Sequence, residues 1–123
     1  MPSLNKVIII GYVGKDPEMR FSPSGQPTTS FSVATSRRYK KGDEWQEETE
    51  WFNVVTWAKL AETCNQILIK GSLVYVEGRQ QTHTWEKDGV KHYKTELIAN
   101  SVTKLDKTEK TDSGGDTPAE QPF

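Results

Sequence analysis

Aromatic and basic side chains are interleaved in two short stretches of the chain. Residues 37–41 read Arg-Arg-Tyr-Lys-Lys, and Trp45 follows shortly after them. Trp85 precedes residues 86–91, which read Glu-Lys-Asp-Gly-Val-Lys, and Tyr93 comes next on the returning arm. Aromatic rings stack on nucleobases and cations attract phosphates, a combination typical of surfaces that bind single-stranded nucleic acid. The pattern occurs twice, which favours that chemistry more than either copy does alone.

Two more tryptophans, Trp51 and Trp57, lie six residues apart in a segment rich in β-branched and aromatic residues. In a regular strand, side chains an even number of residues apart point to the same face. If Phe52 and Val54 fill the core, both tryptophans face outward, where large apolar rings commonly mark an interaction surface. The alternative is that a partner subunit or a covering loop buries them.

The first basic stretch also fits a solvated hairpin tip, because acidic residues follow it closely: Asp43, Glu44, Glu47, Glu48 and Glu50. A protein-interaction module is the second class of function that the rings allow. The salt dependence of binding would distinguish a nucleic-acid interface from a protein interface. For single-stranded nucleic acid, the logarithm of the binding constant falls against the logarithm of the salt concentration with a slope of about −0.7 per neutralised phosphate. RNA stays open as well, since stacking and phosphate contacts do not by themselves distinguish ribose from deoxyribose.

Groups suited to catalysis or metal binding are few in the sequence. His83 and His92 are expected on facing arms of one hairpin, but two imidazoles without a third ligand make a poor zinc site. Cys64 is the single cysteine, so it cannot form an internal disulfide, and we expect it to be a small core residue. The sequence shows no nucleophile with a base and no carboxylate pair at a pocket. We therefore expect a protein that is not an enzyme and that uses no cofactor or metal ion.

The elements that position the rings are mostly strands. Alternating and β-branched segments predict strands at residues 6–13, 29–35, 49–57, 73–85 and 92–105. Turns are expected at residues 22–27, 41–43 and 88–89, and a bulge or bend at Gly11 and Gly14. One apolar stripe predicts a helix over residues 58–69 with Gly71 at its C-terminal cap: Leu60, Ala61, Cys64, Ile67 and Leu68. Five strands with a helix between the third and the fourth predict an all-β fold with one helix, the five-stranded Greek-key barrel called the OB-fold.

The charge is distributed unevenly along the 123 residues. Residues 1–105 contain 14 Lys and Arg against 12 Asp and Glu, a balance of +2, whereas residues 106–123 contain 2 against 5, a balance of −3. The second segment has almost no large apolar side chain, so it cannot offset the entropy of ordering. We expect one OB-fold domain over 1–105 and a disordered acidic tail over 106–123. No apolar run is long enough to span a bilayer and no secretory signal is apparent, which predicts a cytoplasmic protein with no membrane contact.

Several segments resemble the bacterial single-stranded DNA-binding protein family over residues 5–105. They are NKVIIIG at 5–11, DPEMR at 16–20, TEWFNVV at 49–55, KLAE at 59–62, KGS at 70–72 and VYVEG at 74–78, in the expected order. The resemblance implies base stacking on Tyr39, Trp51, Trp57 and Trp85. The family often has Trp at the first of these positions and Phe at the third, and both exchanges keep a ring.

The same resemblance implies a homotetramer that wraps single-stranded DNA during replication, recombination and repair. Candidate phosphate contacts are the basic residues Lys6, Arg20, Arg37, Arg38, Lys40, Lys41, Lys59, Lys70, Arg79, Lys87 and Lys91. Family tails usually end in an acidic tip closing with Pro-Phe, which docks onto replication, recombination and repair proteins. The matching residues here are Asp116, Glu120, Pro122 and Phe123, with fewer acids than is usual and Gln121 where an apolar residue is common.

Overall fold

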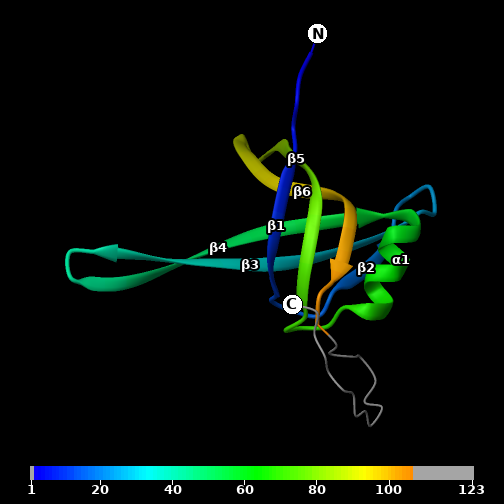
Figure 1. The fold of residues 1–123 in the computed structure, drawn as a ribbon. Helices are drawn as coiled ribbons and strands as arrows, with labels where there is room; N and C mark the ends of the chain where they lie inside the picture. The colour runs from blue at the N-terminus through cyan, green and yellow to red at the C-terminus, as the bar shows by residue number, and fades with distance from the viewer. Residues whose placement is uncertain (1, 107–123) are drawn as a thin grey trace.

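Five strands close into a barrel in the computed structural model, which describes residues 2–106 (Figure 1). In chain order the elements are β1 (Val7–Val13), β2 (Glu18–Phe21), β3 (Pro27–Lys41), β4 (Glu44–Trp57), α1 (Ala58–Ile67), β5 (Leu73–Lys87) and β6 (Val90–Lys104). The barrel order is β1-β5-β6-β4-β3, and β1 also pairs with β3 to close it. This is the predicted OB-fold, with α1 between the third and fourth barrel strands. β2 is an addition to it, pairing with β3 alone.

The core forms where the inward side chains of the strands meet under α1. Its fully buried members include Val33, Val54, Leu68, Val74 and Val76. On β1, β3, β4 and β5 buried and more exposed positions alternate, as the period of two predicts. β1 stays paired with β5 as far as Tyr12, where it also begins to pair with β3, and a Cβ on the preceding Gly11 would lie 2.2 Å from the carbonyl oxygen of Ala34. What the structure shows at this glycine, where a bulge or bend was expected, is a close approach of two backbones.

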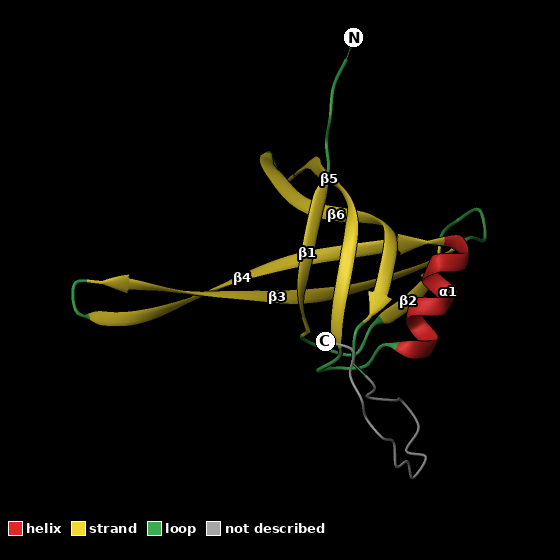
Figure 2. Ribbon diagram, in the orientation of Figure 1, coloured by secondary structure: helices red, strands yellow, loops and turns green. Residues whose placement is uncertain are grey.

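Two hairpins extend beyond the barrel, and the β3–β4 hairpin is the longer projection in the view of Figure 2. β3 and β4 stay paired without a register shift from Thr28 and Trp57 to Lys41 and Glu44. The β5–β6 hairpin closes at Asp88 and Gly89, both with positive φ (55° and 78°), the backbone of a type I′ turn. All predicted turns are present, but the hairpin strands run several residues further than expected.

The helix ends earlier than the sequence predicted. Leu68, expected inside it, is already extended at φ −97° and ψ 141°, and its side chain is fully buried. Gly71 does have a positive φ of 91°, but it lies in the loop before β5, where its N–H donates to the carbonyl of Val13 at 2.8 Å. The prediction of Gly71 as the helix cap was therefore wrong, because the helix ends at Ile67 and Leu68 is its C-cap.

No helix in residues 2–106 has both the length and the apolar character needed to cross a bilayer.

Candidate nucleic-acid interface

Trp51 and Trp57 occupy the outer face of β4, and their positions follow from the inner face. Val54 and Thr56 are buried and Phe52 packs against the core, so the odd-numbered residues of the strand point away from it. Trp51 is 57% and Trp57 45% exposed. The sequence analysis expected both rings to face outward, and the structure confirms it. The Trp51 ring rests against Gly14, at the end of β1.

Trp85 lies on the β5–β6 hairpin and is stacked on His92 across the ladder. Their ring centroids are 5.4 Å apart and their planes are 18° from parallel. Trp85 shares its face of β5 with Arg79, whose cross-strand partner Ile98 is on the outside of the barrel next to Val55. Trp85 and Trp51 therefore belong to the same outer surface, on two different hairpins.

The two histidines of this hairpin have separate partners. His83 Nε2 lies 2.9 Å from Glu96 Oε1, and Lys94 Nζ lies 3.6 Å from the other oxygen of that carboxylate. His92 is occupied by its stack on Trp85. Over residues 2–106 no cluster of His, Cys, Asp and Glu has the makings of a metal site.

Tyr39 lies on the opposite face of the β3–β4 hairpin from Trp51. The continuous register puts Tyr39 opposite Gln46 and Arg37 opposite Glu48, on the side that becomes the barrel interior. Arg37 covers the tyrosine ring at 4.9 Å and forms an ion pair with Glu48. Tyr39 is 36% exposed, the least among the four predicted rings.

Trp45, which the sequence analysis noted but did not assign to stacking, is on the Trp51 face and is 60% exposed. A signal for it was present in the sequence, since tryptophans recur at positions 45, 51 and 57, an even spacing of six. Arg38 and Lys40 lie over its ring, at 5.2 and 6.0 Å.

The candidate phosphate contacts differ in their surroundings. Three of them form ion pairs: Lys6 with Glu77 at 3.2 Å, Arg20 with Glu18 at 3.4 Å, and Arg37 with Glu48. Within residues 2–106 the others form none: Arg38, Lys40, Lys41, Lys59, Lys70, Arg79, Lys87 and Lys91.

The carboxylate of Glu77 is held by two donors. Tyr75 donates its hydroxyl hydrogen to Glu77 Oε1 at 2.8 Å, and Lys6 binds the other oxygen. The Tyr75 hydrogen bond, helped by Lys6, lowers the pKa of Glu77, and the same hydrogen bond raises the pKa of Tyr75. Lys6 is thus engaged before any phosphate arrives.

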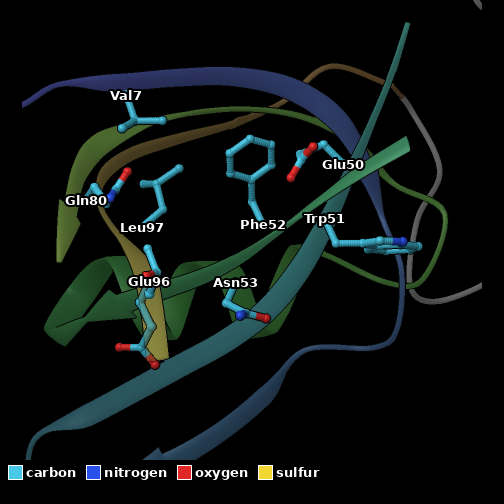
Figure 3. A pocket seen from close by; sticks show the side chains of 9 residues that line it. Val7, Glu50, Trp51, Phe52, Asn53, Gln80, Glu96 and Leu97 are labelled. Atoms are coloured by element: carbon cyan, nitrogen blue, oxygen red, sulfur yellow. The ribbon is translucent and has the colours of Figure 1, made fainter. Parts of the chain in front are cut away.

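A pocket of about 280 Å³ lies where the two hairpins diverge (Figure 3). β4 and β6 pair only at Val54–Leu97 and Val55–Ile98, so a fork opens between them further along. Apolar side chains of Val7, Phe52 and Leu97 line it together with Trp51 and polar residues, namely Glu50, Asn53, Gln80, Thr95 and Glu96. The pocket offers an apolar surface beside the Trp51 ring, with two carboxylates that disfavour a phosphate inside it.

The expected tail lies almost wholly outside the described residues, including Asp116, Glu120, Pro122 and Phe123. Its first residue, Asp106, is described, and its carboxylate accepts a hydrogen bond from the N–H of Leu73 at 3.2 Å and pairs with Lys104 at 3.4 Å.

The fold and this surface define an OB-fold protein with an exposed row of rings and cations, the arrangement that binds oligonucleotides in this class of barrel. Sequence comparison narrows the class, since residues 4–105 match the model of the single-strand binding protein family. The chain belongs to that family.

Curated relatives and solved structures agree with this placement. The chain is 46% identical over 117 residues to single-stranded DNA-binding protein 1 of Chlorobaculum tepidum, covering 93% of this chain and 70% of the relative. It is 41% identical over 123 residues to the single-stranded DNA-binding protein of Neisseria meningitidis, covering 98% of this chain and again 70% of the relative.

Two solved structures share the fold at 30% sequence identity. One is the Plasmodium falciparum SSB in a complex with single-stranded DNA. Its TM-score is 0.80, and the match covers 86% of this chain and 98% of that one. The other is a deletion mutant of the single-stranded DNA binding protein from Thermus aquaticus, with a TM-score of 0.75, covering 84% of this chain and 51% of that one.

Proposed function

We propose that the protein binds single-stranded DNA without reading its base sequence, and that it acts by binding and not by catalysis. Trp51, Trp57, Trp85 and Tyr39 stack on bases, which tolerates any sequence because every base has a π-face. The observation that supports this most is the exposure of Trp51 and Trp57 on the outer face of a strand whose inner face lines the core. Bound in this way, the strand is kept unpaired and shielded during DNA replication, recombination and repair in the cytoplasm.

Lys and Arg side chains follow the phosphates between the stacked bases. Those that form no ion pair in residues 2–106, such as Arg38, Lys40 and Lys87, do so without first losing a carboxylate partner. Lys6, Arg20 and Arg37 must exchange a carboxylate for a phosphate, so each contributes less to the free energy of DNA binding.

Four copies of the chain assemble around the DNA. Support for self-association comes from the outer face of β1, where Ile8, Ile10 and Tyr12 are 52, 54 and 57% exposed. Together with the half-buried Tyr75 and Leu73, the partners of Ile10 and Tyr12 on β5, they form an apolar row, the kind of patch that marks a protein interface. The molar mass of the wild type and of the Ile10→Ser variant, measured by light scattering, tests the assembly of four chains. A monomeric wild type would rule out the tetramer.

The tail residues Asp116, Glu120, Pro122 and Phe123 dock onto replication, recombination and repair proteins. Support comes from their match to the family's acidic Pro-Phe ending. Deleting residues 116–123 is expected to leave DNA affinity unchanged and to abolish capture of such a partner.

A tryptophan-fluorescence titration tests the central proposal. A thymine homopolymer is expected to quench the emission strongly, duplex DNA is expected to have little effect, and added salt is expected to weaken binding. Equal binding of duplex DNA would contradict the preference for single strands, and the absence of any binding to the single strand would make a protein-interaction module the better interpretation. Equal affinity for a uracil homopolymer of RNA and a thymine homopolymer of DNA would extend the function to RNA.

A further inference from the structure

The β3–β4 hairpin presents two faces of different composition. β4 contributes Trp45, Glu47, Thr49 and Trp51 to one face, which continues into Asn53 and Trp57 on the outside of the barrel. It contributes Glu44, Gln46, Glu48 and Glu50 to the other, which Tyr39 shares from β3. Trp45 and Trp51 thus lie on one side of the ribbon, six residues and roughly 20 Å apart at ~3.3 Å per residue.

Charge separates along the same division. The Trp45 face has Arg38 and Lys40 against Glu47, a formal balance of +1, whereas the Tyr39 face has Arg37 and Lys41 against Glu44, Glu48 and Glu50, a balance of −1. Moreover, Arg37 on the acidic face is already bound to Glu48. Most of the acidic residues of the hairpin therefore lie on the face opposite Trp45. A phosphate chain is better accommodated on the Trp45 face.

Trp45 has the surroundings of a stacking ring and lacks those of a core residue. It is 60% exposed, more than Trp51, Trp57 or Trp85. Arg38 Cζ and Lys40 Nζ lie over the ring at 5.2 and 6.0 Å, and neither forms an ion pair in the part of the chain described. Cations held this close to an exposed ring are positioned to contact phosphates while a base stacks on the ring.

From these contacts we propose that Trp45, Arg38 and Lys40 form an additional subsite for single-stranded DNA near the tip of the β3–β4 hairpin. The base of one nucleotide stacks on Trp45 and the two cations bind the adjoining phosphates. The subsite extends the row of Trp57 and Trp51 along one face of the hairpin, and it rests on the proposed function of the protein.

A variant with a single tryptophan tests the proposal directly. The chain has four tryptophans, so replacing Trp51, Trp57 and Trp85 by Phe keeps a ring at each site and leaves Trp45 as the only tryptophan emitter. Titration with a long thymine homopolymer is expected to quench Trp45, and salt is expected to reverse the quenching. A saturated complex with unchanged Trp45 emission would overturn the proposal.

Affinity measurements supply the second test, with the wild-type background. Trp45→Ala is expected to weaken binding of the same homopolymer about five- to 150-fold, which corresponds to about 1 to 3 kcal/mol for one stacked base. Trp45→Phe is expected to retain most of the affinity, and Gln46→Ala, its neighbour on the opposite face, to retain all of it. Because of the charge difference, Tyr39→Ala is expected to cost less than Trp45→Ala.

Trp51→Ala distinguishes failure of this subsite from failure of the proposed function. If Trp51→Ala weakens binding and Trp45→Ala does not, the subsite is refuted while the function stands. If both folded variants bind like the wild type, stacking on Trp45 and on Trp51 is refuted. A circular dichroism melt of each variant separates these outcomes from loss of the hairpin.

Discussion

The ring of Trp51 lies against Gly14 so closely that a Cβ on this glycine would be 2.5 Å from Trp51 Cζ3 and 2.9 Å from Cη2. Gly14 itself is fixed by its N–H, which donates to the carbonyl of Ser32 at 2.9 Å. The glycine therefore leaves room for the six-membered part of the indole at the end of β1. It sets the position of a proposed stacking group without touching DNA.

Gly14→Ala is expected to displace the Trp51 ring and weaken binding of single-stranded DNA. The loss is expected to reach at most that of Trp51→Ala, about 1 to 3 kcal/mol. Fluorescence titration of both single variants and of the double variant measures it. If Gly14 acts through Trp51, the double variant binds like Trp51→Ala alone. Additive losses would show that the alanine disturbs another part of the surface.

His92 is expected to orient Trp85 for stacking. The two rings are nearly parallel at 5.4 Å, so removing the imidazole frees Trp85 to turn and costs ordering entropy on binding. His92→Ala is expected to weaken DNA binding by up to about 1 kcal/mol, and His92→Phe, which keeps a flat partner, to restore it. His83→Ala on the same face serves as the control. A loss in His92→Ala that His92→Phe does not reverse would contradict the stacking role.

The barrel and its outer rings were predictable from the sequence because burial produces a pattern. In β4 the period of two placed Phe52 and Val54 on one face and Trp51 and Trp57 on the other, and the structure shows that the first of these faces is the inner one. Where β3 and β4 leave the barrel neither face is buried, so the alternation disappears and the predicted strands stopped at Thr35 and Thr49. Backbone pairing between the strands continues there regardless, which is why the hairpin was longer than expected.

The separation of Tyr39 and Trp51 onto opposite faces could not be predicted from the sequence for the same reason. It depends on an unbroken register from the barrel to the turn at Gly42 and Asp43, and a single bulge would have reversed it. The helix end shows a similar limit. The apolar stripe includes Leu68, but only the packing shows that this residue reaches the core from an extended backbone.

Thr29 joins the barrel to the helix and is expected to contribute to stability. Its buried hydroxyl donates to the carbonyl of Ala61 at 2.7 Å, and its own carbonyl accepts from the hydroxyl of Thr56 at 3.0 Å. Thr29→Val keeps the shape but leaves the Ala61 carbonyl without this donor, so the free energy of unfolding is expected to fall by about 1 kcal/mol. Urea denaturation measures the change.

Thr28→Val provides the matched control, because the Thr28 hydroxyl lies near the surface and makes only a 3.4 Å contact with the carbonyl of Arg20. Its effect is expected to stay within about 0.5 kcal/mol. Equal effects of the two variants would mean that the buried hydrogen bond adds nothing to stability.

Cys64 is expected to make the fold sensitive to alkali. Burial of Cys64 on the inner side of α1 raises the pKa of its thiol from 9.0 to about 11, against a smaller opposing effect of the hydrogen bond with Thr56. The folded state therefore keeps its proton between pH 9 and 11 while the unfolded state loses it, so stability is complete below about pH 9 and falls as the pH rises towards 11. A shift of about two units corresponds to a loss of up to about 3 kcal/mol.

Urea denaturation at a series of pH values from neutral to strongly alkaline tests this dependence. Cys64→Ala is expected to be less stable at neutral pH, because it leaves a small cavity, and to lose less stability as the pH rises. The native thiol is expected to react slowly with an alkylating reagent at neutral pH and rapidly once urea unfolds the chain. A wild-type and a Cys64→Ala protein with parallel pH profiles would show that this thiol does not control the alkaline limit of the fold.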